Sequence, residues 1–196
     1  MSLDPVTLVG SHVRLEPMLP EHHPDLCAIG LEEELWRWTV NQCVSPEDMK
    51  RYMETAFEEA RRGTSLPFVT IDTASGTVVG STRFGNIDLK NKKVEIGWTW
   101  IGRRWQRTCI NTEAKLLMLK HAFENLYCNR VELKTDRLND KSRNAIHRLG
   151  ASEEGTLRSH MLTDSGRRRD TVYYSILKEE WPEIEETLKQ KLSDRS

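Results

Sequence analysis

The chain has 196 residues, of which 37% are hydrophobic and 30% are charged, and its formal net charge at pH 7 is -1. This length suits one domain of ordinary size, and the composition is typical of a folded, well-solvated protein and not of a disordered chain. Affinity for nucleic acid depends on neutralising phosphates with clustered basic residues. The near-neutral charge therefore argues against nucleic acid as the main partner.

The sequence lacks the signals that direct a chain to a membrane or to an oxidising compartment. No apolar run approaches the roughly 20 residues that a membrane-spanning helix needs. The opening residues, MSLDPVTLVG, do not have the basic and apolar regions of a signal peptide. Four scattered cysteines (Cys27, Cys43, Cys109 and Cys128) form no CxxC pair, and the six histidines show no metal-ligand spacing. We therefore expect a cytoplasmic protein with reduced thiols, no metal and no membrane partner.

The first half of the chain is predicted to contain a short hairpin, two helices and three strands. β-prone runs at residues 6–8 and 13–16 flank a break at Gly10-Ser11, and a helix is expected over residues 20–30. A second helix should begin at Ser45, because a capping side chain, a proline and two acids follow one another there, and should end near Gly63. Strands are then predicted over residues 66–72, 78–87 and 94–101.

The second half contains the strongest helical pattern, over residues 111–126. Apolar side chains recur there at spacings of three and four, at Ala114, Leu117, Met118, Ala122 and Leu126. The remaining predicted elements are a strand over 130–135, a helix over 139–149, a hairpin with strands 155–162 and 171–177, and a C-terminal helix opened by Trp181-Pro182. Without repeats or linkers, this order predicts one mixed α/β domain over residues 1–196, with at least one parallel crossover.

A basic loop joins the predicted strand 94–101 directly to the predicted helix 111–126. The stretch from the loop into the helix reads RRWQRTCINTEAKLLMLKHAF, at residues 103–123. The first turn of a helix has unpaired amides and a partial positive charge, so it can bind an anion. Arg103, Arg104 and Arg107 precede this turn, and guanidinium groups bind phosphate through two parallel hydrogen bonds. The segment predicts a pyrophosphate site, and the alternative is a solvated basic loop that binds nothing.

Several stretches resemble the GNAT family of acyl-CoA-dependent N-acyltransferases, and within it the RimJ/RimL-like branch of ribosomal-protein alanine N-acetyltransferases. They are VEIGWTW (94–100), the loop and helix above, RVELKTDRLNDKSRNAIHRLG (130–150) and EGTLRSHMLTDSGRRRDTVYYSI (154–176). The resemblance extends from VRLEPM (13–18) to the last strand. It implies a GNAT fold, with a central, mostly antiparallel sheet, splayed parallel strands and flanking helices. It also implies transfer of an acetyl group from acetyl-CoA to a primary amine.

The resemblance also implies which residues contact acetyl-CoA. The family pairs a splayed strand with the pantetheine arm and wraps the pyrophosphate in a loop of pattern Gln/Arg-x-x-Gly-x-Gly/Ala. The matching positions here are Trp98, Thr99, Trp100, Ile101, Arg104, Gln106, Arg107, Thr108, Cys109, Ile110 and Asn111. Arg107 and Cys109 replace the two glycines, which would permit the closest backbone approach. This departure leaves an alternative function, an acyl-CoA-binding module with little or no turnover.

Acetyl transfer to an amine needs a base, an oxyanion donor and an acid. Glu95 resembles the family position that holds a base, often acting through water; alternatively it is a strand carboxylate paired with a lysine. A backbone amide near Trp98–Trp100 is the expected oxyanion donor. Ile146 takes the place of the family's tyrosine acid, whereas Ser142 matches a serine of the RimL-like branch and Asn139 a residue that contacts the cofactor. Asn139 and Ser142 would equally suit a helix cap.

The acceptor wall is expected at Trp36, Arg37 and Trp38, although two tryptophans equally fit a core. The triplet at residues 167–169 is interpreted as a solvated hairpin tip in preference to a site for an acidic substrate. The acceptor is either a protein N-terminus or a small-molecule amine such as a polyamine, an amino acid or an aminoglycoside, and no motif selects one. The Trp-rich stretch is also compatible with a homodimer.

Overall fold

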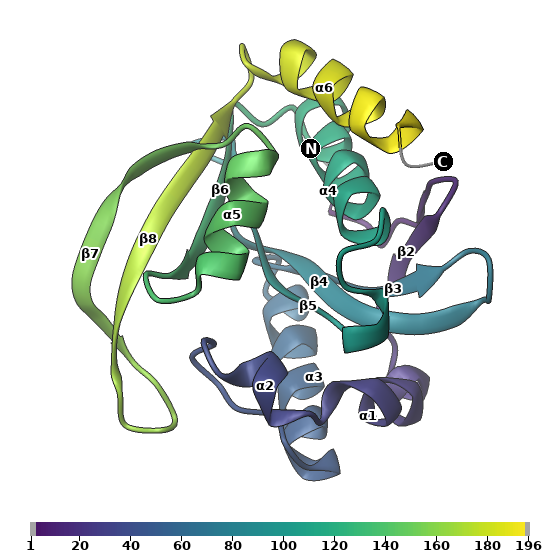
Figure 1. Cartoon of the computed structure of the whole chain (residues 1–196), viewed down its shortest axis with the longest axis vertical. Coiled ribbons are helices and arrows are strands. Elements are labelled where there is room, and N and C mark those ends of the chain that lie inside the picture. Colours follow the sequence, from purple (N-terminus) through teal and green to yellow (C-terminus); the bar gives the residue numbers. More distant parts are fainter. Residues whose placement is uncertain (1–2, 195–196) are drawn as a thin grey trace.

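The computed structural model describes residues 3–194, which are organised around one eight-stranded sheet with helices on both faces (Figure 1). The strands are β1 Leu8–Val9, β2 Val13–Pro17, β3 Leu66–Asp72, β4 Thr77–Asp88, β5 Lys93–Ile101, β6 Arg130–Asp136, β7 Ser152–Leu162 and β8 Arg168–Leu177. Their order in the sheet is β1-β2-β3-β4-β5-β6-β8-β7. Among these neighbours β5 and β6 are parallel and the other pairs are antiparallel.

The helices follow the predicted order. They are α1 His23–Gly30, α2 Glu33–Trp36, α3 Pro46–Arg61, α4 Ile110–Lys120, α5 Asp140–Arg148 and α6 Trp181–Ser193, with single turns at Pro20–His22, Arg103–Trp105 and His121–Asn125. Ser45 caps α3 as expected, because its hydroxyl accepts the Asp48 amide at 3.2 Å while the Asp48 carboxylate accepts the Ser45 amide at 3.0 Å. The mixed α/β fold is confirmed, and α4 forms the predicted crossover between two parallel strands.

Each face of the sheet is covered by its own apolar cluster. The cluster under α4 and α6 includes Phe68, Met118, Leu119, Ile176 and Leu188. The cluster under α1 and α3 includes Leu26, Trp36, Met49, Met53 and Trp100. In Figure 1 the first three helices gather at one end of the molecule, whereas α4 and α6 lie together at the other. The two halves of the chain therefore contribute separate layers to one sheet.

The parallel pair β5–β6 is joined over a short length. Residues 93–95 pair with residues 130–132, and no described residue beyond Glu95 continues this ladder, although β5 runs on to Ile101 and β6 to Asp136. The strands therefore splay apart, as the resemblance implied. One backbone edge of β5 from Ile96 to Ile101 is free of a neighbouring strand, and such an edge can pair with an extended ligand.

The N-terminal hairpin is anchored to the start of α4 by one buried carboxylate. Glu113, 6% exposed, accepts the main-chain amides of Ser11 at 2.9 Å, His12 at 2.6 Å and Val13 at 2.7 Å. A Cβ at residue 10 would lie 2.5 Å from this carboxyl group, so the turn requires Gly10. The contact joins residues about a hundred positions apart and fixes the beginning of α4 against the sheet.

In the described part of the chain, the fold is not stabilised by a metal site of three or more ligands or by a disulfide, and no helix spans a membrane. No group of three His, Cys, Asp or Glu side chains between residues 3 and 194 is arranged to hold a metal ion. The four cysteines form no disulfide with one another, and none of the described helices is long and apolar enough to cross a bilayer. Packing and hydrogen bonds stabilise this part of the chain.

We predict that Glu113→Gln lowers the free energy of unfolding by about 1–3 kcal/mol, because the amide presents one acceptor oxygen to three buried donors. Urea unfolding of the two proteins measures the difference. Glu179→Gln, at an exposed position, is the matched control and should change little. Equal effects of the two substitutions would contradict the anchoring role of Glu113.

Candidate active site

The part of β5 that has no β6 neighbour contains a β-bulge, centred on Trp98, in its pairing with β4. Arg83 of β4 pairs with Gly97, but Ser81 pairs with Trp100, so Trp98 and Thr99 together oppose one residue of β4. Trp98 has a φ of +50°, a left-handed conformation that is uncommon outside glycine. The bulge removes these residues from regular pairing at the place where the two parallel strands diverge.

The bulge changes the direction in which the side chains of β5 point. Val94 and Ile96 lie in the cluster under α4, whereas Trp100, an even number of positions later, lies in the cluster under α3. Regular alternation would put all three on one face, so one inserted residue accounts for the difference. In consequence Trp98 and Trp100 both face α3, and Thr99 faces α4.

On the α3 side, an almost fully buried arginine fixes the bulge. The Arg83 guanidinium, 1% exposed as a residue, lies 4.7 Å from the Trp98 ring and 5.0 Å from the Tyr52 ring, and it donates to Glu59 at 2.9 Å. The Tyr52 hydroxyl donates to the Trp98 carbonyl at 3.2 Å. A Cβ on Gly85 would lie 2.2 Å from the Trp98 ring, so the indole rests directly on the backbone of β4. These contacts hold an unfavourable backbone conformation in place.

On the α4 side, a buried lysine contacts the same bulge. Lys115, 5% exposed, donates from Nζ to the Thr99 hydroxyl at 2.6 Å and lies 3.4 Å from the Thr82 hydroxyl. No carboxylate in residues 3–194 forms an ion pair with it. Burial lowers the pKa of Lys115 to about 7. A lysine held in this way loses much of its charge near neutral pH.

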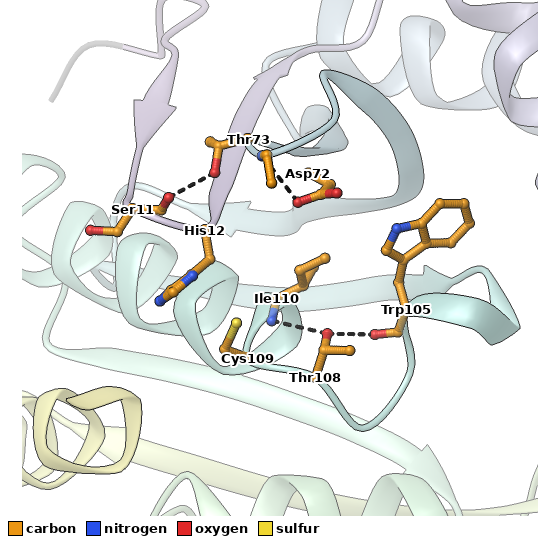
Figure 2. A pocket seen from close by; sticks show the side chains of 9 residues that line it. Ser11, His12, Asp72, Thr73, Trp105, Thr108, Cys109 and Ile110 are labelled. Atoms are coloured by element: carbon orange, nitrogen blue, oxygen red, sulfur yellow. Dashed lines mark hydrogen bonds between the residues drawn. The ribbon is translucent and has the colours of Figure 1, made fainter. Parts of the chain in front are cut away.

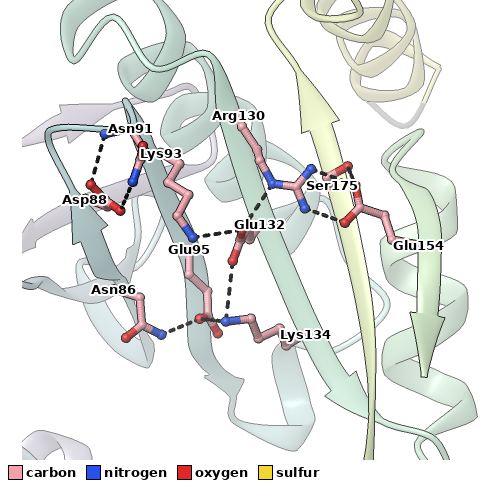
Figure 3. Close-up of polar contacts among 10 residues, drawn as sticks. All are labelled: Asn86, Asp88, Asn91, Lys93, Glu95, Arg130, Glu132, Lys134, Glu154 and Ser175. Atoms are coloured by element: carbon pink, nitrogen blue, oxygen red, sulfur yellow. Dashed lines mark hydrogen bonds and ion pairs between the residues drawn. The ribbon is translucent and has the colours of Figure 1, made fainter. Parts of the chain in front are cut away.

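Glu95 occupies the last paired position before the strands diverge (Figure 3). Its residue is 7% exposed, and Oε2 accepts from Asn86 at 2.6 Å and from Lys134 at 2.7 Å. The predicted lysine pairing of this carboxylate is therefore present. Oε1 makes no hydrogen bond to any described residue and lies 3.0 Å from the place where a Gly97 Cβ would be. This oxygen is directed along β5 toward the splay.

The surrounding charges form a continuous network across the parallel strands β5 and β6 (Figure 3). Lys134 also contacts Glu132 at 3.5 Å, and Glu132 in turn contacts Lys93 at 3.3 Å and Arg130 at 3.1 Å. Burial by itself would lower the pKa of Lys134, but Glu95, Tyr173 and Glu132 together outweigh it and the pKa is raised. Lys134 therefore remains a cation beside Glu95.

The basic loop after β5 keeps a glycine-like backbone despite its sequence. Arg107, at the first glycine position of the family pattern, has a φ of +65°, and its side chain is exposed. Cys109, at the second, has an ordinary right-handed conformation with a φ of −70°. The substitution at residue 107 therefore preserves the main-chain path that glycine would adopt, and the larger side chain points to solvent.

Side chains on both sides hold this loop against its neighbours. Gln106 donates to the Ile101 carbonyl at 2.8 Å and accepts a hydrogen bond from Lys141 of α5. Thr108 donates to the Trp105 carbonyl at 2.7 Å and accepts the Ile110 amide at 3.4 Å. The loop thus bridges the open end of the splay, from β5 to the first turn of α5.

An open cavity of about 400 Å³ lies on the outer side of the loop (Figure 2). It is lined by Ser11, His12, Asp72, Thr73, Ala74, Trp105, Thr108, Cys109 and Ile110. Its walls come from the N-terminal hairpin, the β3–β4 turn and the loop itself. Thr73 joins the turn to the hairpin, and Glu113 joins the hairpin to the start of α4. The first turn of α4 is therefore accessible from this side as well as from the splay.

The start of α5 faces the splay from the β6 side. Asn139 caps this helix, because its side-chain oxygen accepts the Ser142 amide at 3.0 Å. The half-buried Ser142 hydroxyl makes no hydrogen bond to any described residue, whereas Ile146 is buried in the core. The capping role is present, and it leaves the Ser142 hydroxyl available to a ligand.

The predicted acceptor residues separate into core and surface. Trp36 is 3% exposed, its ring lies 5.6 Å from that of Trp100, and its indole N–H donates to the Gly30 carbonyl at 2.6 Å. It therefore supports β5 from beneath. Arg37 is exposed and Trp38 is half-buried, so these two offer surface to a ligand.

The β7–β8 turn closes against this same segment. The Arg167 guanidinium lies 5.4 Å from the Trp38 ring and donates to the buried Asp136 carboxylate. The Asp164 amide donates to the Val40 carbonyl at 2.9 Å. These contacts hold the Arg167 side chain against the protein. The turn is therefore not the solvated hairpin tip that we expected.

Comparison with known proteins identifies the family. Residues 12–152 match the model of the acetyltransferase (GNAT) domain. The chain belongs to the GNAT family. This GNAT chain is 30% identical to YdaF of Bacillus subtilis (strain 168), a proposed ribosomal N-acetyltransferase, over 88% of its own length and 95% of that protein.

Solved GNAT structures agree with this assignment. A GCN5-related N-acetyltransferase from Brucella melitensis superimposes with a TM-score of 0.88 at 30% identity, over 96% of this chain and 86% of that one. Mycobacterium smegmatis RimJ, in complex with CoA-disulfide, superimposes with a TM-score of 0.84 at 25% identity, over 98% and 97%. The RimJ/RimL-like resemblance is therefore confirmed, and this GNAT chain is an N-acetyltransferase.

Three residues that hold the GNAT site together were missed in the sequence: Tyr52, Arg83 and Lys115. One of the three could have been recognised in the sequence. Lys115 lies next to Ala114 and three residues before Met118, so it interrupts the buried stripe of the predicted helix. A charged residue at such a position is rarely buried without a specific reason.

We predict that Arg107→Gly does not lower the free energy of unfolding and raises it by at most about 1 kcal/mol, because glycine adopts a positive φ without steric cost. Arg107→Val should lower it by about 1–2 kcal/mol. Arg104→Gly, in the same loop, is the control and should be mildly destabilising. A destabilising Arg107→Gly would show that residue 107 does not adopt the left-handed conformation. Thermal or urea unfolding measures all three.

We predict that Lys115→Met stabilises the fold, most strongly near and below pH 7. A free lysine titrates near 10.5 and buried Lys115 near 7, so the unfolded chain binds this proton more tightly than the native protein does. The unfolded state is therefore stabilised relative to the native wild type as the pH falls from 10.5 to 7. The gain on substitution should reach about 4 kcal/mol at pH 7, less the lost hydrogen bonds, and shrink toward pH 10. Urea unfolding between pH 6.5 and 9.5 measures it, with exposed Lys120→Met as control. A pH-independent gain would contradict the titration of Lys115.

Proposed function

We propose that this N-acetyltransferase binds acetyl-CoA along the free edge of β5 and transfers the acetyl group to a primary amine by direct attack in a ternary complex. The observation that carries the proposal is the free backbone edge of β5 between Ile96 and Ile101, on the side opposite β4, which leads directly into the basic loop and the first turn of α4. A pantetheine arm carries amide groups that can pair with such an edge, as a peptide strand would.

The loop suits the phosphates of coenzyme A. First-turn amides of α4 point toward the loop, and the helix dipole favours an anion there. Arg104 and Arg107 are both exposed beside this turn, and the left-handed conformation at residue 107 keeps the main chain on the path that a glycine would take. The lost glycines therefore do not argue for a disabled site.

The two faces of β5 present different groups to the two reactants. Glu95 lies on the face away from α4, whereas Thr99 lies on the face toward it. An amine that arrives beside Glu95 would meet, through the gap between the strands, a thioester bound on the α4–α5 side. This arrangement favours direct attack over a covalent intermediate on the protein.

Acetyl-CoA supplies the activated thioester, and the chain supplies the groups that move protons. Glu95 accepts the proton of the attacking amine, directly or through water, with Oε1 as the oxygen that has no other partner. A bulge amide near Trp98–Trp100 donates to the developing oxyanion. The Ser142 hydroxyl, at the start of α5, protonates or stabilises the departing thiolate.

We further propose a protein N-terminus as the acceptor, with ribosomal proteins as the first class to test. The names of YdaF and RimJ support this choice. The charge of the site supports it as well: Arg37, Lys134 and Arg167 each pair with a carboxylate, so these residues do not form the strongly acidic cleft that would favour a polyamine or an aminoglycoside. Arg37 and Trp38 would line the entry. Because ribosomal proteins are made in the cytoplasm, we propose that compartment for the enzyme.

We predict micromolar binding of acetyl-CoA by calorimetry, weakened at least about tenfold by Arg107→Glu, which places a negative charge beside the phosphates. Arg107→Gly should bind within a few-fold of the wild type if the main chain dominates. Arg61→Glu, at the exposed end of α3, is the charge-matched control. An absence of binding by the wild type would overturn the proposal.

We predict thiol release from acetyl-CoA with peptides that begin with alanine or serine, and little release with spermidine, free alanine or kanamycin. Glu95→Gln should lower kcat/KM by about 10²-fold while acetyl-CoA affinity is kept. A protein that binds acetyl-CoA but releases no thiol with any amine of this panel would instead be the acyl-CoA-binding module.

A further inference from the structure

Three side chains meet beneath the bulge on the α4 side, and the site described above does not yet use them. The Thr99 and Thr82 hydroxyls are 2.7 Å apart, and Lys115 Nζ lies 2.6 Å from Thr99 and 3.4 Å from Thr82. Lys115 and Thr82 are buried, whereas Thr99 is exposed. The cluster therefore connects a buried amine to the free edge of β5 through one exposed hydroxyl.

The hydrogen-bonding capacity of these groups determines where the Thr99 proton points. As an ammonium Lys115 can only donate, so it donates to Thr99, and the Thr82 hydroxyl can take the donor role in its own bond to Thr99. A hydroxyl that accepts two hydrogen bonds has used both lone pairs and can only donate further. Apart from the Thr82 hydroxyl, the acceptor within reach among the described residues is the Gly97 carbonyl at 3.4 Å, which is long for a hydroxyl donor. The Thr99 proton is therefore available to a ligand on the exposed side.

Packing does not explain a lysine at this position. A methionine would fill the same space, and Met118 one turn later already does so on the same helix face. Burying an amine without a carboxylate disfavours folding, because the ammonium loses its hydration. Groups that reduce stability in this way are often retained for activity.

We propose that Lys115 is a positioning residue for acetyl transfer, which holds the Thr99 hydroxyl as a hydrogen-bond donor to the thioester of acetyl-CoA. Thr99 would then be a catalytic residue, adding a side-chain donor to the backbone amide of the bulge. The inference rests on the proposed function, because it requires the thioester to lie along β5. No proton leaves Thr99 or Lys115 in this role; the pair stabilises the negative charge that develops on the thioester as the amine attacks.

The test compares Lys115→Met, Thr99→Val, the double variant and Thr99→Ser with the wild type, using acetyl-CoA and the most active amine of the panel above. We expect kcat to fall about 10- to 100-fold in Lys115→Met and Thr99→Val, while the Kd for acetyl-CoA stays within about threefold. Thr99→Ser, which keeps the hydroxyl, should retain most activity. The double variant should be no slower than the slower single variant, because both substitutions remove the same donor.

Thermal unfolding without ligand separates this role from a structural one. Lys115→Met should have an unchanged or higher Tm while being slower, a combination that loss of a structural contact does not produce. A lower Tm with kcat within about twofold of the wild type would overturn the inference, and so would independent, multiplying losses in the double variant. If the wild type neither binds acetyl-CoA nor releases thiol, the proposed function fails as well. If the wild type is active and the variants match it, the inference alone fails.

Discussion

The bulge at Trp98 is the constraint on which the rest of the site depends. One inserted residue interrupts the pairing of β5 with β4, which resumes at Trp100, and turns the following side chains to the opposite faces. It also frees main-chain groups at the point where β5 and β6 part. The positive φ of Trp98 is unfavourable by itself, and the structure offsets it with contacts from α3 on one side and α4 on the other.

Those contacts come from a basic side chain on each side, a guanidinium on one and an amine on the other. Arg83 lies between two aromatic rings beneath the bulge, and Lys115 lies behind it with hydroxyl partners. Lys134 pairs with Glu95 at the neck of the splay. Hydrogen-bond donors placed around a gap favour ligands that carry or develop negative charge, such as the reacting thioester of an acyl-CoA.

The sequence predicted the elements well because each has a local signal. Capping at Ser45, the apolar stripe after Ile110 and the hairpin formed by the last two strands all depend on neighbouring residues. The bulge could not be predicted, because its cause is packing against Gly85 and Arg83 on another strand. For the same reason Trp36 was assigned to the acceptor wall, although its position in the chain also fits the core where it lies.

The sequence also predicted the residues of the candidate site better than their surroundings. The resemblance pointed to Glu95, the loop at residues 103–111 and the start of α5, and the structure gathers these around one splay. It did not indicate that Lys134 pairs with Glu95 or that residue 107 keeps a glycine-like path.

The contact of Glu113 with the N-terminal hairpin has a consequence for synthesis. Residues 11–13 leave the ribosome long before Glu113, so the loop can acquire its final shape only after α4 has been made and the two distant segments meet.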